Sequence, residues 1–155
     1  MAAPDHRLTA DADALLRDAG AEADRLRHEY LGTEHLTLAL VGRPDGVAGA
    51  VLRDVADGAP GVRDTLATVL APGRDTRAPG AERPFTSRTL EALRLAAAHA
   101  RALGRDAVGP EHVLLGILAE RHNIGAQALA HHGVTLEAAL AAVRRLDGGG
   151  PARPS

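Results

Sequence analysis

Two Glu-His pairs hold the side chains of this sequence that could do chemistry. Glu34 and His35 form the first pair, and Glu111 and His112 form the second, 77 positions later. A carboxylate beside an imidazole can act in acid–base catalysis or bind a metal ion. No second histidine follows either one at the three- or four-residue spacing that places two ligands on one helix face. We therefore favour a buried neutral imidazole bonded to backbone over a zinc enzyme, and expect no catalytic residue, metal or cofactor.

Each pair opens an apolar helix. A Gly comes two residues before each Glu, followed by Thr33, which suits a helix cap, or by Pro110, which suits a first turn. The Glu then stands where the helix dipole favours negative charge. The residues that follow, 36–41 and 113–118, have no polar face wide enough for solvent. Both segments are therefore predicted to be central helices that others surround.

The repetition extends far beyond these pairs and indicates an internal duplication. An insertion around residues 58–61 reduces the offset from 77 to 74 in the later part of the sequence. Apolar positions that step by three and four predict four helices in each copy, and hence an all-α fold. At the offset of 77 the matching residues include Thr9 with Thr86, Leu16 with Leu93, Arg17 with Arg94, Leu26 with Leu103, Gly32 with Gly109 and Leu38 with Leu115.

The duplication sets the expected domain organisation. A domain over residues 1–147 would contain repeat one, about 8–70, and repeat two, about 85–146. Residues 71–84 lack periodicity and are rich in Pro and Gly, so we predict a linker there. The Gly-rich end, 148–155, is predicted to be a flexible tail.

Composition excludes several classes of protein. Hydrophobic residues make up 45% of the chain but aromatic residues only 1%, so the core must be built from Leu, Val, Ile and Ala. The chain has no Cys, which removes disulfides and thiolate chemistry. A net charge of -2 with interspersed signs predicts no nucleic-acid face. Without a long apolar run or a signal peptide, we expect no membrane association and a cytoplasmic location.

Several motifs point to one family: the two copies of Gly-x-Glu-His, the run Leu114-Leu115-Gly116-Ile117-Leu118, and the later Gly125-Ala126-Gln127-Ala128-Leu129 and Gly133-Val134-Thr135-Leu136. Together they resemble the Clp N-terminal domain, the module at the front of ClpC and ClpA type unfoldases. The resemblance covers about residues 7–146 and implies a pseudo-twofold bundle of eight helices, made of two four-helix repeats. Such a module recruits substrates and adaptor proteins for a AAA+ motor and is not itself catalytic.

The resemblance also implies recognition of phosphorylated arginine at one site in each repeat. A carboxylate would pair with the guanidinium, and hydroxyl, backbone N–H or Arg donors would surround the phosphate. The matching residues are Glu34 with Thr9 and Arg7 in the first repeat, and Glu111 with Thr86 in the second.

The second of these sites departs from the pattern, and each residue also has a structural interpretation. Pro84 occupies the position equivalent to Arg7, which leaves Arg83 or Arg88 as possible substitutes. For Thr9 and Thr86 we favour helix capping alone. For the two glutamates, ligand binding and stabilisation of a helix N-terminus stay equally open, since the dipole effect is only ~0.3 to 1 kcal/mol.

Phe85 is the candidate contact for a second kind of ligand. In actinobacterial members of the family, cyclic-peptide antibiotics bind between the N-terminus and the start of the second repeat through aromatic side chains. Phe85 matches one such position, but the other aromatic is replaced by Asp5 or His6. A hydrophobic staple before the Thr86 cap explains Phe85 equally well.

Three hypotheses follow for the whole protein. With no Lys, a phosphate-binding loop of the motor type cannot be assembled. The first hypothesis is a stand-alone, monomeric regulator or decoy that binds Clp-system adaptors, phosphoarginine-marked clients or peptides. A fragment of a longer unfoldase is the alternative reading of the same chain. The second hypothesis is a decoy for cyclic-peptide antibiotics, and the third, disfavoured above, is a metal-dependent helical enzyme.

Overall fold

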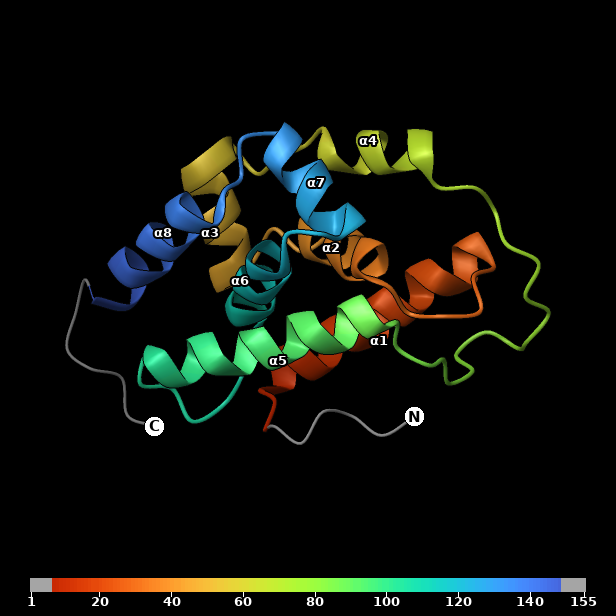
Figure 1. Cartoon of the computed structure of the whole chain (residues 1–155), viewed down its shortest axis with the longest axis horizontal. Helices are drawn as coiled ribbons and strands as arrows, with labels where there is room; N and C mark the ends of the chain where they lie inside the picture. Colours follow the sequence, from red (N-terminus) through yellow and green to blue (C-terminus); the bar gives the residue numbers. More distant parts are fainter. Residues whose placement is uncertain (1–6, 149–155) are drawn as a thin grey trace.

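The computed structural model of the protein describes residues 7–148. Within this range the chain folds into eight α-helices without a β-strand, which confirms the predicted all-α architecture. Figure 1 shows α2 and α6 in the middle, with α1 and α5 on one side and α3, α4, α7 and α8 on the other. The helices are α1 (Ala10–Leu26), α2 (Thr33–Val41), α3 (Val47–Ala56), α4 (Val62–Val69), α5 (Ser87–Ala102), α6 (Pro110–Glu120), α7 (Ile124–His131) and α8 (Leu136–Gly148).

The two central helices are buried almost throughout, as their sequences predict. Every residue of α2 from Thr33 to Leu40 is buried, and so is every residue of α6 from Glu111 to Leu118. Close packing of α6 against α5 depends on Gly116, where an added Cβ would lie 2.0 Å from the carbonyl oxygen of Ala92. In a core with few aromatic residues, small side chains thus let the helix backbones approach each other and pack closely.

The helix starts follow the sequence with one exception. Thr9 Oγ1 accepts a hydrogen bond of 3.0 Å from the Ala12 N–H, and Thr86 Oγ1 accepts one of 3.1 Å from the Thr89 N–H, so both threonines cap their helices. Thr33, in contrast, is the first residue of α2, and Gly32 occupies the cap position. The cap at α2 therefore comes from another side chain.

The two repeats cross over at the starts of α1 and α5, where each of these outer helices begins against a segment of the other repeat. The Thr9 N–H donates to the Val108 carbonyl at 2.9 Å, and the Val108 N–H donates to the Arg7 carbonyl at 2.9 Å. In the same way, the segment entering α5 pairs with the one entering α2, because the Thr86 N–H donates to the Leu31 carbonyl at 3.1 Å. Each capped outer helix thus begins beside the Glu-His helix of the other repeat.

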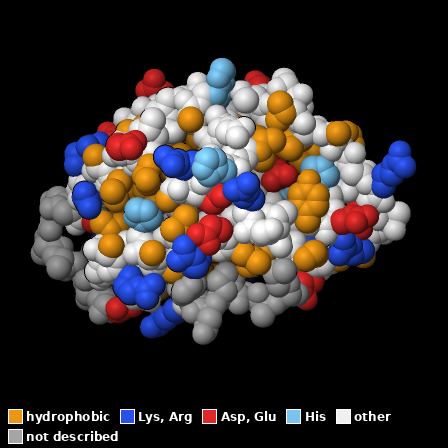
Figure 2. Space-filling model, viewed as in Figure 1, with side chains coloured by type: hydrophobic (Ala, Val, Ile, Leu, Met, Phe, Trp, Pro, Cys, Tyr) orange, Lys and Arg blue, Asp and Glu red, His pale blue; other side chains and the backbone are white. Residues whose placement is uncertain are grey.

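Residues 71–84 are held against the end of α1. The Gly73 N–H donates to the Leu26 carbonyl at 2.8 Å, and the Asp75 N–H donates to the Arg27 carbonyl at 3.0 Å. The predicted tail begins at Gly148, which is the last residue of α8, and its other residues lie outside the described range. None of the described helices is both long and apolar enough to cross a bilayer. Figure 2 shows acidic and basic side chains intermingled on one face of the molecule.

Candidate functional site

The histidine of each Glu-His pair caps the N-terminus of its own helix. His35 is fully buried, and its Nδ1 accepts a hydrogen bond of 2.9 Å from the Gly32 N–H. His112 is equally deep, and its Nδ1 accepts a 2.9 Å bond from the Gly109 N–H. The predicted buried imidazole bonded to backbone is confirmed in both repeats. These side chains supply the caps that Gly32 and Gly109 cannot.

A second histidine, missed by the sequence analysis, contacts His35. His28 Nδ1 lies 2.7 Å from His35 Nε2, and His28 Nε2 lies 2.8 Å from the Ala71 carbonyl oxygen. Because the Gly32 N–H can only donate, neutral His35 must carry its proton on Nε2 and donate it to His28 Nδ1. His28 then donates from Nε2 to Ala71. All three bonds of this chain are satisfied by one pair of tautomers.

The donor set of this cluster includes the residue types of a metal site. Ligand atoms of His28, Glu34 and His35 all lie within 4.8 Å of one another. The seven-residue spacing between the histidines crosses the turn between α1 and α2, so a rule for ligands on a single helix overlooks it. However, the tautomer fixed by Gly32 leaves His35 Nε2 protonated, without a lone pair for a metal ion. The geometry therefore fits a hydrogen-bonded chain better than metal coordination.

Burial also shifts the acid–base behaviour of His35. The pKa of His35 is lowered to about 4, first by burial and then by the neighbouring His28 and the positive charge of Arg83. The imidazole therefore stays neutral near pH 7, which is the form that can accept from the Gly32 N–H.

Both glutamates are buried, and each carboxylate folds back against the glycine at the N-terminus of its own helix. Glu34 is 8% exposed and Glu111 is 6% exposed. A Cβ added to Gly32 would lie 2.1 Å from Glu34 Oε1, and one added to Gly109 would lie 2.4 Å from Glu111 Oε1. Only glycine leaves room for the carboxylate at these two positions.

The surroundings of the two carboxylates differ. The Tyr30 hydroxyl donates to Glu34 Oε2 at 3.4 Å and its ring stacks on His28, with ring centroids 5.3 Å apart. At the equivalent position, repeat two has Ala107. Glu34 therefore has an aromatic wall that Glu111 lacks.

Two cavities meet at Glu111, and Thr9, Gly109 and Glu111 line both of them. One, of about 320 Å³, is lined in addition by Asp11, Arg43 and Asp45. The other, of about 440 Å³, is lined in addition by Arg7, Arg105, Asp106 and His112. The sequence analysis grouped Arg7 and Thr9 with Glu34, but the crossed repeats place them beside Glu111. Thr86, by the same exchange, lies beside the mouth of α2 that carries Glu34.

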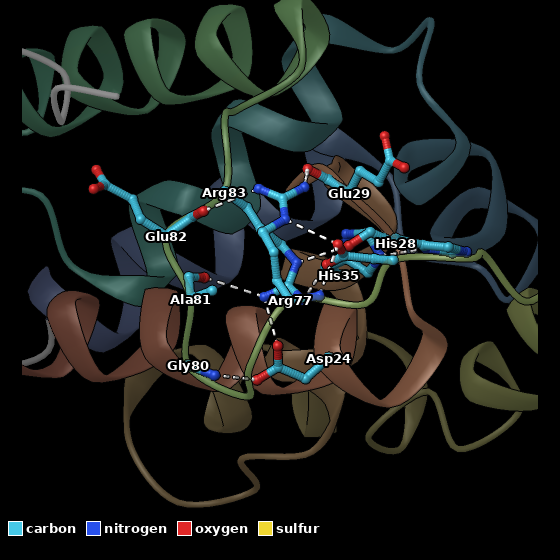
Figure 3. A network of polar contacts seen from close by, with 10 residues as sticks. Asp24, His28, Glu29, His35, Arg77, Gly80, Ala81, Glu82 and Arg83 are labelled. Carbon is cyan, nitrogen blue, oxygen red and sulfur yellow. Dashed lines mark hydrogen bonds and ion pairs between the residues drawn. The ribbon is translucent and has the colours of Figure 1, made fainter.

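Arg83, one of the two predicted substitutes for a phosphate-binding arginine, is used elsewhere. It is only 6% exposed. Its Nε donates to the His28 carbonyl at 2.7 Å, and its Nη atoms pair with Asp24 at 2.5 Å and Asp75 at 2.9 Å, as Figure 3 shows for Asp24 and His28. Because its guanidinium is already engaged by two carboxylates and by the backbone, Arg83 is poorly placed to bind a phosphate, and its role as a substitute stays a prediction.

Arg88, the other predicted substitute, stays available. Its Nη1 pairs with Glu120 Oε2 at 2.7 Å, and its side chain is 57% exposed. Arg88 lies in the first turn of α5, next to Thr86, and therefore on the side of the molecule that carries Glu34.

Phe85 lies at a separate groove of about 480 Å³. The ring is partly buried and packs on the hydrophobic core. Leu16, Gly20 and Leu31 line the groove with it. The position of Phe85 is thus compatible with both a staple and a ligand contact.

Comparison with known protein families and sequences gives a consistent result. A family model described as the Clp repeat (R) N-terminal domain matches residues 7–146. The chain is 35% identical over 127 residues to the chloroplastic ATP-dependent Clp protease ATP-binding subunit ClpA homolog of Brassica napus. It is 33% identical over 142 residues to the ClpA homolog of Guillardia theta. These matches cover 82% and 92% of this chain, but 14% and 17% of the relatives, so the chain spans about a sixth of their length.

Solved structures show the same fold. The N-domain of ClpV from Vibrio cholerae superposes with a TM-score of 0.73 at 16% identity, covering 96% of this chain and 92% of that one. The N-terminal domain of the chaperone ClpD from Arabidopsis thaliana gives a TM-score of 0.67 at 19% identity, covering 92% and 96%. At these identities the likeness concerns the fold alone.

Proposed function

Because the chain belongs to the Clp repeat N-terminal domain family, we propose that it is a non-catalytic protein-binding module of a Clp protease system. Its clients or adaptors would present phosphorylated arginine, and the site would be the pair of cavities that meet at Glu111. The observation that carries this proposal is the combination of a buried carboxylate with a capping hydroxyl and several guanidinium groups in one place.

The chemistry of that combination matches both halves of the ligand. The Glu111 carboxylate can accept from the ligand's guanidinium, as buried Arg–carboxylate pairs do. The Thr9 oxygen already accepts from Ala12, but its hydroxyl hydrogen can still donate to a phosphate oxygen. Arg7 and Arg105 line the cavity on one side of Glu111, and their positive charge attracts an anionic ligand to the site.

The Glu34 side supports a second, weaker site. Thr86 and the exposed Arg88 lie on that side, but Arg88 is bound to Glu120, and Tyr30 contacts Glu34 directly. We also keep the groove at Phe85 as a proposed contact for peptide ligands, including cyclic ones, because it is the more apolar of the cavities near the predicted site residues.

Calorimetric titration with free phosphoarginine tests the main site. We expect Glu111→Gln to weaken binding by roughly 10- to 100-fold, since one charge-assisted hydrogen bond contributes about 1.5–3 kcal/mol. Glu34→Gln should weaken binding less. Glu137→Gln, at an exposed position in the first turn of α8, is the matched control and should bind like the wild type. Equal affinity of the wild type and the Glu111→Gln variant would contradict the proposal.

A further inference from the structure

At the edges of the Glu34 and Glu111 sites, an acidic and a basic residue occupy exchanged positions. At the repeat offset of 77, Asp11 corresponds to Arg88, and Arg43 corresponds to Glu120. On the Glu34 side, the arginine is in the first turn of the outer helix and the acid is at the end of the central helix α6. On the Glu111 side the acid is in the first turn of α1, and the arginine directly follows α2. Each of these two residue pairs therefore contains one arginine, supplied by a different element on each side.

The backbone that carries Arg43 is fixed. The Arg43 N–H donates to the Leu40 carbonyl at 3.2 Å. The next turn is pressed onto α3, because a Cβ added to Gly49 would lie 2.1 Å from the Pro44 carbonyl oxygen and 2.9 Å from that of Arg43. The Arg43 side chain thus extends from a rigid backbone at the edge of the cavity that Glu111 lines.

The side chain of Arg43 is held more loosely than its backbone. Its Nη1 pairs with Asp18 Oδ2 at 2.7 Å, and the side chains of these two residues are 31% and 51% exposed. An ion pair this exposed is weak, because water screens it and ordering both side chains costs entropy. A ligand with a stronger negative charge can therefore take the guanidinium from Asp18.

Without Arg43, the cavity it lines would repel a phosphate. Its lining includes the carboxylates of Asp11, Asp45 and Glu111, and Arg43 is the one basic residue among the lining residues. Three carboxylates would attract an unmodified guanidinium but disfavour the same group once it carries a phosphate.

We propose that Arg43 is the specificity-determining residue of the Glu111 site. When the ligand binds, the Arg43 guanidinium leaves Asp18 and pairs with the phosphate, while the guanidinium of the ligand faces Glu111. This inference rests on the proposed function. It assigns to Arg43 the distinction between phosphoarginine and arginine, whereas Glu111 serves both ligands.

The test compares free phosphoarginine with free arginine in calorimetric titrations of four proteins. For Arg43→Gln we expect the ratio of the two affinities to fall by roughly tenfold or more, with arginine binding at least as tightly as before. Asp18→Asn should bind phosphoarginine a few-fold more tightly, because the competing carboxylate is gone. Arg94→Gln, which removes an exposed arginine of α5 paired with Glu91, is the matched control and should leave the ratio unchanged.

The outcomes separate the two proposals. If the wild type binds phosphoarginine and Arg43→Gln keeps the wild-type ratio, the role of Arg43 is overturned while the proposed function stands. If the wild type binds neither ligand, the proposed function itself fails. Thermal melting of each variant shows whether a change in affinity reflects the site or the fold.

Discussion

Replacing Arg83 with methionine is expected to lower the free energy of unfolding by about 3 kcal/mol, which is the low end for breaking a buried ion pair. Methionine fills the volume of the arginine stem but leaves Asp24 and Asp75 without their shared partner. The low end applies because the Asp24 side chain keeps 20% of its surface exposed. The loss would also weaken the attachment of residues 71–84 to the end of α1, which the backbone hydrogen bonds of Gly73 and Asp75 would still hold.

Urea unfolding at neutral pH measures this loss, and two further variants show its origin. Arg83→Lys keeps the charge but cannot bond to the His28 carbonyl and both carboxylates at once, so it should recover only part of the stability. Arg94→Met removes an exposed i,i+3 pair with Glu91 and should cost little. If the Arg83→Met variant were as stable as Arg94→Met, the ion pairs of Arg83 with residues of α1 and the linker would not contribute to the stability of the fold.

Acid should destabilise the protein through His35. Its pKa is about 4 in the fold against an ordinary value of 6.5, so between these pH values the unfolded chain binds a proton that the folded chain does not. Stability is therefore complete above pH 6.5 and falls as the pH drops towards 4. One fully buried imidazole with this shift contributes a loss on the order of 3 kcal/mol.

The comparison of His35→Asn with the wild type isolates this effect. Asparagine can still accept from the Gly32 N–H but does not titrate, so we expect a lower stability at pH 7.5 and a flatter dependence between pH 6.5 and 4.5. Burial alone would raise the pKa of Glu22, but its hydrogen bonds and ion pairs with Arg63 and Arg25 together lower it, so Glu22 contributes a loss below that window in both proteins. His122→Asn, at an exposed position, should keep the wild-type slope. An equally steep slope in His35→Asn would assign the acid sensitivity to another group.

Much of the fold could be predicted because its signals are local. The caps at Thr9 and Thr86, the apolar runs of α2 and α6 and the duplication each lie within one segment or one offset. The sequence predicts a linker over residues 71–84 but not its contacts with the end of α1, because these contacts come from distant partners. Its Pro, Gly and charged residues look like a flexible connection until Arg83 is seen to reach Asp24 and the His28 carbonyl.

The candidate site residues were named from the sequence, but their arrangement in space was not. The family resemblance groups the candidate residues by repeat, whereas the bridges between Leu8 and Val108 and between Leu31 and Phe85 exchange partners between the repeats. This exchange moves Arg7 and Thr9 to Glu111. Arg43 was missed for a related reason, since the role that we propose for it depends on charges that the other repeat and α1 bring to the same cavity.

The most direct measurement of the proposed binding is an NMR titration of the wild-type protein with phosphoarginine, followed through the backbone amides. The Thr9 and Gly109 amides should shift first and saturate together, because both residues line the two cavities that meet at Glu111. The Gly32 amide, at the Glu34 side, should shift later or less. The account would be contradicted if no amide shifted at millimolar phosphoarginine, or if the shifts were confined to the surroundings of Gly32.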